Sequence, residues 1–146
     1  MTIIPAFFHA VENWECAVHR VGGLQWLDEP MAKLRVGRAV TPSGTVEEAI
    51  IEIAGGRITA ITDGGPDDGL WAVPGFVDTH CHGAVGVSFG DPDPEANLRA
   101  AEYHRSQGTT TLFASTVTEP LEKLEAQCRV LRGLVEAGEL DGIHLE

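Results

Sequence analysis

The hydrophobic pattern of residues 74–146 alternates between two periods, and this alternation constrains the fold more than any other feature of the sequence. Short apolar runs typical of strands alternate with segments whose apolar residues recur every three or four positions, as they do in amphipathic helices. The resulting order is strand, helix, strand, helix, strand, with short connections. Because this order is typical of a parallel sheet, the predicted fold class is α/β.

The ends of both helices can be predicted from local signals. Within residues 91–108, Asp93 is the expected N-cap, Pro94 lies in the first turn and Gly108 ends the helix. The second helix is expected to end at Gly138. Its apolar residues repeat at steps of three and four and are Leu121, Leu124, Cys128, Leu131 and Val135. The predicted strands are 71–82, entered through Pro74-Gly75, then 109–117 and 141–146.

Residues 31–73 are predicted to form part of a small β domain. A turn is expected at 41–44, and the clearest hairpin is 49–61, whose Gly-Gly dipeptide can take the positive φ angles of a tight primed turn. An acidic, glycine-rich loop follows at 63–69.

Residues 1–30 have two interpretations. They can form an amphipathic helix that begins near Pro5 and ends at Gly22, with an apolar stripe running from Phe7 to Val21. Alternatively, Met31 is the natural start and the segment is an upstream extension. Both interpretations stay open, and no functional residue is assigned here.

The net charge limits the possible partners, and the cysteine content indicates a cellular compartment. The net charge of −12 argues against nucleic acid or an anionic membrane as a partner. No apolar run approaches the roughly 20 residues that span a bilayer, and no signal peptide is visible. Three widely separated cysteines, Cys16, Cys81 and Cys128, suggest reduced thiols in a cytoplasmic protein.

The most informative candidate site is the pair His80 and His82 at the end of an apolar strand. Residues two apart on a strand share a face, so both imidazoles are expected to point the same way, with Asp78 behind them and Cys81 on the opposite face. Two convergent imidazoles at the carboxyl end of a strand predict a site for a divalent metal such as zinc. The alternative is an incidental polar pair on a loop rim.

Other polar residues near this strand are given structural interpretations. Cys81 and Cys128 are expected in the core, and His104 is expected to face solvent from the first helix. The glycines at 83, 86 and 90 lack the spacing of a phosphate-binding loop, so a mobile loop beside the metal is expected instead.

Three segments carry a resemblance to a known family. "VPGFVDTHCHG" (73–83) resembles the first barrel strand of the amidohydrolase superfamily, with its Pro-Gly-apolar-apolar-Asp-x-His-x-His pattern, and 49–61 resembles the β segment that precedes it. "GTTTLFASTVT" (108–118), followed by a helix and "GIHLE" (142–146), resembles N-acetylglucosamine-6-phosphate deacetylases. The resemblance implies an incomplete TIM-type (β/α)8 barrel, with its first three strands and two helices in 74–146, preceded by part of a small β-sandwich domain.

The resemblance also implies a ligand set and a reaction. Glu146 matches the carboxylate that binds the main metal, while His80 and His82 match the pair that holds a second metal in members that retain it. One or two divalent ions are expected, with zinc favoured. The implied reaction converts N-acetylglucosamine 6-phosphate and water into glucosamine 6-phosphate and acetate, in a full-length enzyme expected to be a homodimer.

The same resemblance implies that the chain is the amino-terminal part of such an enzyme. The general acid/base aspartate is expected beyond residue 146. The chain alone is therefore expected to be inactive and to expose an unpaired strand edge.

Two other functions remain open. Dihydroorotase-like or hydantoinase-like members of the superfamily share the histidine pair but take a carboxylated lysine from the fourth strand, and the "HLE" at 144–146 argues against them. A non-enzymatic α/β module with a structural metal is the second alternative. Structural zinc sites are normally closed by four ligands, so a set of three fits an open, catalytic type of site better.

Overall fold

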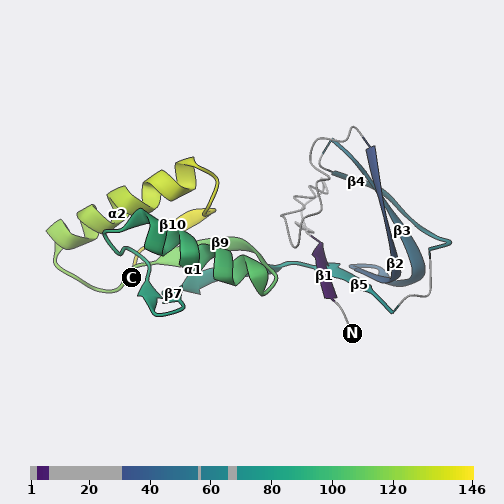
Figure 1. The fold of residues 1–146 in the computed structure, drawn as a ribbon, viewed down its shortest axis with the longest axis horizontal. Coiled ribbons are helices and arrows are strands. Elements are labelled where there is room, and N and C mark those ends of the chain that lie inside the picture. Colours follow the sequence, from purple (N-terminus) through teal and green to yellow (C-terminus); the bar gives the residue numbers. More distant parts are fainter. Residues whose placement is uncertain (1–2, 7–30, 56, 66–68) are drawn as a thin grey trace. The chain divides into compact units, whose positions relative to one another are not determined.

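A computed structural model describes residues 3–6, 31–55, 57–65 and 69–146 (Figure 1). The chain divides into two compact units, Met1–Gly75 and Phe76–Glu146. The apolar stripe predicted from residue 7 to residue 21 lies outside the described residues. Pro5, predicted to begin a helix, lies instead in a strand, β1 (Ile3–Ala6), which pairs in parallel with Trp71–Pro74.

The first unit contains a five-stranded sheet with the order β1-β5-β2-β3-β4. Its further strands are β2 (Met31–Thr41), β3 (Gly44–Ala54), β4 (Arg57–Asp63) and β5 (Trp71–Pro74). Strands β2, β3 and β4 form an antiparallel meander with turns at the two predicted places. The predicted hairpin is confirmed and is longer than expected, because β3 already begins at Gly44. Gly55 takes a φ of 58° at its turn, a conformation that glycine adopts without steric cost.

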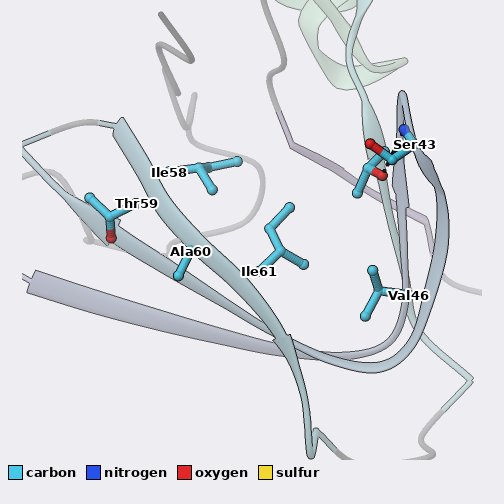
Figure 2. Close-up of a pocket in the computed structure, with 7 residues that line it drawn as sticks. Ser43, Val46, Ile58, Thr59, Ala60 and Ile61 are labelled. Carbon is cyan, nitrogen blue, oxygen red and sulfur yellow. Dashed lines mark hydrogen bonds between the residues drawn. The ribbon is translucent and has the colours of Figure 1, made fainter.

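This sheet contributes a small buried core, and a hollow also lies along its strands. The fully buried apolar residues are Val36, Ala39, Ala49, Ile51 and Ala72. An open hollow of about 370 Å³ is lined by Thr41, Ser43, Val46, Ile58, Thr59, Ala60 and Ile61, and Figure 2 shows the side chains around it. Among the described residues, no ionisable side chain lines this hollow.

The second unit contains a three-stranded parallel sheet with the order β10-β9-β6. Its elements are β6 (Phe76–Cys81), β7 (Gly83–Ala84), β8 (Val87–Ser88), α1 (Pro94–Ser106), β9 (Thr109–Ser115), α2 (Leu121–Glu136) and β10 (Gly142–His144). The predicted α/β class is confirmed. The described chain is richer in strand than predicted, because β1, β7 and β8 are not predicted from the sequence.

The strand predicted over residues 71–82 is divided between the two sheets. Residues Trp71–Pro74 form β5 of the first sheet, whereas Phe76–Cys81 form β6 of the second. The prediction of one strand is therefore wrong. Pro74 has no N–H with which to continue a ladder, and Gly75 tolerates a change of direction, so the chain can leave one sheet and enter the next at this dipeptide.

Both helices of the second unit pack on the same face of its sheet. Ala100 and Ala101 of α1, Leu131 and Leu134 of α2, and Leu112 of β9 belong to one buried cluster. Cys128 is partly buried, whereas the side chain of Leu121, predicted in the apolar stripe, is 71% exposed. Leu121 is the first residue of the helix, where no neighbouring element covers it. Neither helix in the described part of the chain has the length and apolar character needed to cross a bilayer.

The start of α1 is fixed by side-chain hydrogen bonds. The Asp93 carboxylate accepts a bond of 3.0 Å from the Glu95 N–H, as predicted for an N-cap. The fully buried Asn97 accepts from the Gly90 N–H at 2.9 Å and donates to the carbonyl oxygens of Asp91 and Asp93. These bonds hold the loop that connects β8 to α1. Gly108, with a φ of 97°, ends the helix at the predicted residue.

Candidate metal centre

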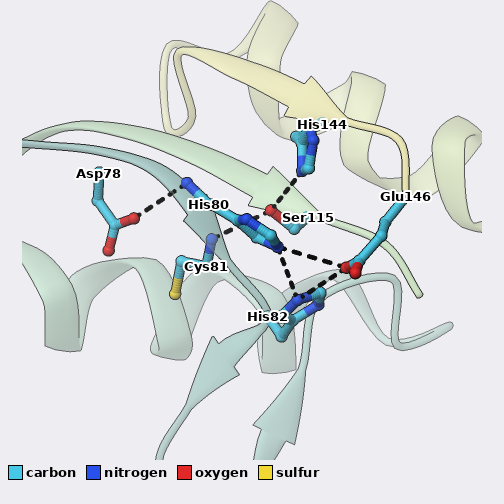
Figure 3. A network of polar contacts seen from close by, with 7 residues as sticks. All are labelled: Asp78, His80, Cys81, His82, Ser115, His144 and Glu146. Atoms are coloured by element: carbon cyan, nitrogen blue, oxygen red, sulfur yellow. Dashed lines mark hydrogen bonds and ion pairs between the residues drawn. The ribbon is translucent and has the colours of Figure 1, made fainter.

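The three predicted ligands lie at the carboxyl ends of two strands of the parallel sheet (Figure 3). His80 is the penultimate residue of β6 and His82 follows that strand directly. Glu146 lies two residues after β10. Because β6, β9 and β10 run in parallel, their carboxyl ends lie at the same end of the sheet. This brings His80 and Glu146, which are 66 positions apart in sequence, into contact.

The ligand atoms of these three side chains converge. His80 Nε2 lies 3.1 Å from His82 Nε2. Glu146 Oε2 lies 3.3 Å from His80 Nε2 and 3.1 Å from His82 Nε2. All three side chains are about half exposed, so the group is open to solvent. The arrangement places two imidazole nitrogens and one carboxylate oxygen around a single point.

A bulge in β6 changes the faces predicted for its side chains. Asp78 pairs with Leu112 of β9 and Cys81 pairs with Ala114, so one extra residue lies in β6 between the two pairs. The prediction that Asp78 shares a face with His80 and His82 is wrong for this reason. Its carboxylate instead accepts the His80 N–H at 3.1 Å and lies near Cys81 and His104.

Ser115 links the three strands next to the candidate ligands. This buried residue ends β9, and its hydroxyl accepts the Cys81 N–H at 3.1 Å. The same hydroxyl lies 3.0 Å from Nδ1 of His144, whose ring centroid is 4.7 Å from that of His80. No role is predicted for Ser115 from the sequence. A polar residue that follows the apolar run 112–114 at the end of a strand is the signal that would identify it.

The segment after His82, predicted as a mobile glycine-rich loop, forms a hairpin in the structure. Strands β7 and β8 pair through a turn at Val85 and Gly86, which have φ angles of 49° and 80°. After the hairpin, the Phe89 N–H donates to the carbonyl oxygen of His82 at 2.8 Å. The hairpin therefore fixes the backbone of one of the two histidines.

Comparison with known proteins gives two deacetylases as sequence relatives. No protein-family model matches the chain. An N-acetylgalactosamine-6-phosphate deacetylase of Escherichia coli O157:H7 is 31% identical over 97 residues, which are 64% of this chain and 26% of the relative. An N-acetylglucosamine-6-phosphate deacetylase of Vibrio furnissii is 29% identical over 128 residues, which are 85% of this chain and 30% of the relative.

Solved structures agree. The N-acetyl-D-glucosamine-6-phosphate deacetylase of Mycobacterium smegmatis superposes with a TM-score of 0.68 and 39% identity over 78% of this chain and 35% of that one. A mutant of a deacetylase from the same organism, in complex with N-acetyl-D-glucosamine-6-phosphate, has the same TM-score at 36% identity, over 80% of this chain and 32% of that one. The resemblance to the N-acetylglucosamine-6-phosphate deacetylases is confirmed. The matched relatives are amide-bond hydrolases of amino-sugar metabolism, and the chain spans about a quarter to a third of their length.

A second group of polar side chains lies beside the candidate metal centre and includes Asp78, Cys81 and His104. Cys81, predicted in the core, is buried, and its Sγ lies 3.0 Å from Nε2 of His104 in α1. The prediction that His104 faces solvent is wrong, because its ring is partly buried against Cys81 and the Gly83 carbonyl oxygen. Burial raises the pKa of the Cys81 thiol, a backbone hydrogen bond of Gly83 opposes this shift, and the negative charge of Asp78 adds to it.

Proposed function

We propose that this chain forms the amino-terminal part of a metal-dependent hydrolase that removes the acetyl group of N-acetylglucosamine 6-phosphate. The convergence of His80, His82 and Glu146 at the carboxyl ends of parallel strands is the observation that carries this proposal. Active sites of (β/α)8 enzymes lie at this end of the strands. The similarity to deacetylases in sequence and in structure supports the same reaction.

The donor set fits a divalent ion. Ligand atoms around a tetrahedral zinc lie ~3.3 Å apart, because Zn–N and Zn–O bonds are about 2.0–2.2 Å long. The three separations of 3.1, 3.1 and 3.3 Å are close to this value. We therefore propose that His80, His82 and Glu146 share one ion, zinc being favoured, while a second ion at this same centre would need further ligands beside these three.

The residues at the candidate metal centre have different parts in the proposed reaction. A bound divalent ion supplies Lewis acidity and lowers the pKa of water. His80 and His82 would hold the ion through Nε2, and the Glu146 carboxylate would add a negative charge. Ser115 accepts the Cys81 N–H and contacts His144, and these contacts hold the end of β6 in position. The carboxylate that protonates the leaving amine is expected outside residues 1–146.

The order of the strands supports an incomplete (β/α)8 barrel. Strands β6, β9 and β10 are neighbours in their sequence order, and both connecting helices pack on one face of the sheet. In a doubly wound sheet the order reverses and helices cover both faces, whereas a barrel keeps sequential neighbours and one layer of helices. We propose that residues 74–146 supply three of eight barrel strands and that 31–73 supply part of a small β domain. The segment 1–30 is proposed as an extension whose residues 3–6 join the sheet of that domain.

The partners follow from the reaction. The proposed substrate is a phosphorylated amino sugar, and the proposed complete enzyme is a homodimer that does not bind nucleic acid or membranes. The cytoplasm is the proposed location, in keeping with the free thiols of Cys81 and Cys128 in the described part of the chain. The galactosamine epimer is a second candidate substrate, because one relative is named for it.

Acetate release from both epimers tests the proposed reaction. The complete protein, expressed with whatever sequence follows residue 146, should release acetate from N-acetylglucosamine 6-phosphate and lose this activity on chelation. Glu146→Gln should lower kcat at least ~100-fold, since it removes a charged ligand, whereas Glu102→Gln on the exposed face of α1 should leave it unchanged.

The 146-residue chain alone should release no acetate. A stable, deacetylating monomer of residues 1–146 would contradict the proposal that the site is completed from elsewhere. A complete protein that hydrolyses only the galactosamine epimer would transfer the assignment to that substrate.

A further inference from the structure

The polar group on the helix-facing side of β6 forms a compact set of metal-binding atoms. The Cys81 thiol, one nitrogen of His104 and one carboxylate oxygen of Asp78 all lie within 4.8 Å of one another. The thiol is 3.0 Å from His104 Nε2. The Gly83 carbonyl oxygen adjoins both, at 3.2 Å from His104 Nε2 and 3.6 Å from Cys81 Sγ.

We propose that Cys81, His104 and Asp78 form a second site for a borderline-soft divalent cation such as Zn²⁺. Sulfur, imidazole and carboxylate are all zinc ligands, and the thiolate favours zinc over magnesium or calcium. The Gly83 carbonyl oxygen or a solvent molecule takes the fourth position.

The separations in the group agree with one ion at its centre. In a tetrahedral site the sulfur and nitrogen ligands lie ~3.5 Å apart, because Zn–S is about 2.3 Å and Zn–N about 2.0–2.1 Å. The pair Cys81–His104 therefore needs to open by about half an ångström. One oxygen of Asp78 is held by the His80 N–H, so the carboxylate is already anchored beside the site.

This site is distinct from the candidate metal centre, although the two share a strand. The side chain of Cys81 leaves β6 on the side of α1 and joins the buried cluster, whereas His80 and His82 meet Glu146. The bulge between Asp78 and Cys81 turns Asp78 away from the histidine pair and toward His104. Positions 78 and 81 are three residues apart, so in a regular strand their side chains would point to opposite faces. The bulge between them removes this alternation, which allows both side chains to approach His104.

The proposed ion would join the end of β6 to α1. Cys81 lies between His80 and His82, so a ligand bond at Cys81 would restrict the backbone that positions both histidines. The inference does not depend on the deacetylase reaction, because it requires only that the described fold bind a cation through a thiolate.

Cobalt absorption tests the proposal directly. Co²⁺ commonly replaces zinc, and a thiolate ligand gives an intense charge-transfer band in the near ultraviolet. The 146-residue chain carrying His82→Ala and Glu146→Ala, which disable the other site, should bind one equivalent of Co²⁺ and show this band. Addition of Cys81→Ser should abolish the band, and Cys128→Ser, which removes a half-buried thiol on α2, should leave it unchanged.

His104→Gln provides a second variant that keeps the thiol. It should weaken Co²⁺ binding at least ~10-fold, as expected for loss of one of three protein ligands, with an unchanged circular dichroism spectrum. Absence of the band in the chain with an intact Cys81 would overturn the proposal, as would a band that persists after Cys81→Ser. The first result would leave Cys81 and His104 as a hydrogen-bonded pair.

Discussion

At the residue scale, the candidate metal centre depends on a few side chains that the backbone holds at strand ends. The alternation of a strand is sufficient to predict that His80 and His82 converge, because the two are separated by one residue. Alternation alone misplaces Asp78, since the bulge that redirects it is set by pairing with β9. The partial burial of His104 also depends on a non-local contact, with Cys81. Metal binding by the three ligands stays a prediction.

Ser115→Ala should destabilise the chain and loosen the candidate metal centre. The substitution leaves the Cys81 N–H without its partner, and an unsatisfied buried donor costs about 1–3 kcal/mol. The free energy of unfolding in urea should fall by that amount, and the affinity for Zn²⁺ should fall with it. Ser88→Ala, at an exposed position of β8, is the matched control and should change neither quantity. Equal stability of the two variants would show that Ser115 is dispensable.

At the scale of single elements, local signals are sufficient for the helices. Asp93 and Gly108 fix the ends of α1 through a cap and a left-handed turn, both of which depend on neighbouring residues alone. The hairpin of β7 and β8 is not predicted, because its strands have two residues each and no hydrophobic alternation. The break between β5 and β6 is missed as well, since an apolar run does not reveal which sheet each half joins.

Asn97→Ala should destabilise α1 and the loop before it. Asn97 is fully buried and bonds to Gly90, Asp91 and Asp93, so its removal leaves several polar groups without partners. The expected loss in the free energy of unfolding is about 2–4 kcal/mol, measured by urea denaturation. Arg99→Ala, on the exposed face of the same helix, should change it by less than about 0.5 kcal/mol. A loss below this value for Asn97→Ala would contradict the role assigned to its side chain.

Two glycine substitutions should have opposite effects. Gly83 has a φ of 131°, and a Cβ there would overlap the Val87 carbonyl oxygen, so Gly83→Ala should disrupt the hairpin and lower the melting temperature. Gly133 lies in α2 with open space around it, so Gly133→Ala should raise stability by about 0.5–1 kcal/mol. Thermal melts of both variants check the pair. A Gly83→Ala variant as stable as the unsubstituted chain would exclude the hairpin geometry described for residues 83–88.

At the scale of the whole molecule, the parallel sheet of the second unit has two open edges among the described residues. Strands β6 and β10 each pair with β9 alone within that sheet. Phe76 and Val77 on β6 are 65% and 56% exposed, which is unusual for apolar residues of a parallel sheet. These features agree with the proposed barrel. The sequence predicts the order of the elements, whereas closure of the sheet into a barrel stays a prediction.

The isolated chain should associate as its concentration rises. Exposed strand edges flanked by apolar side chains pair readily with other strands. Sedimentation velocity over a range of concentrations should show growing oligomers, and Val77→Lys should reduce them by placing a charge at the β6 edge. A monomer at every concentration would indicate that the edges are covered.

Zinc titration of the Cys81→Ser chain tests the central claim most directly, because it leaves His80, His82 and Glu146 as the candidate ligands. Calorimetry should give one equivalent of bound Zn²⁺, lost in His80→Ala/His82→Ala, weakened in Glu146→Gln and unchanged in Glu102→Gln. Unchanged zinc binding after removal of both histidines, or no binding before it, would contradict the assignment of these three residues as a metal centre.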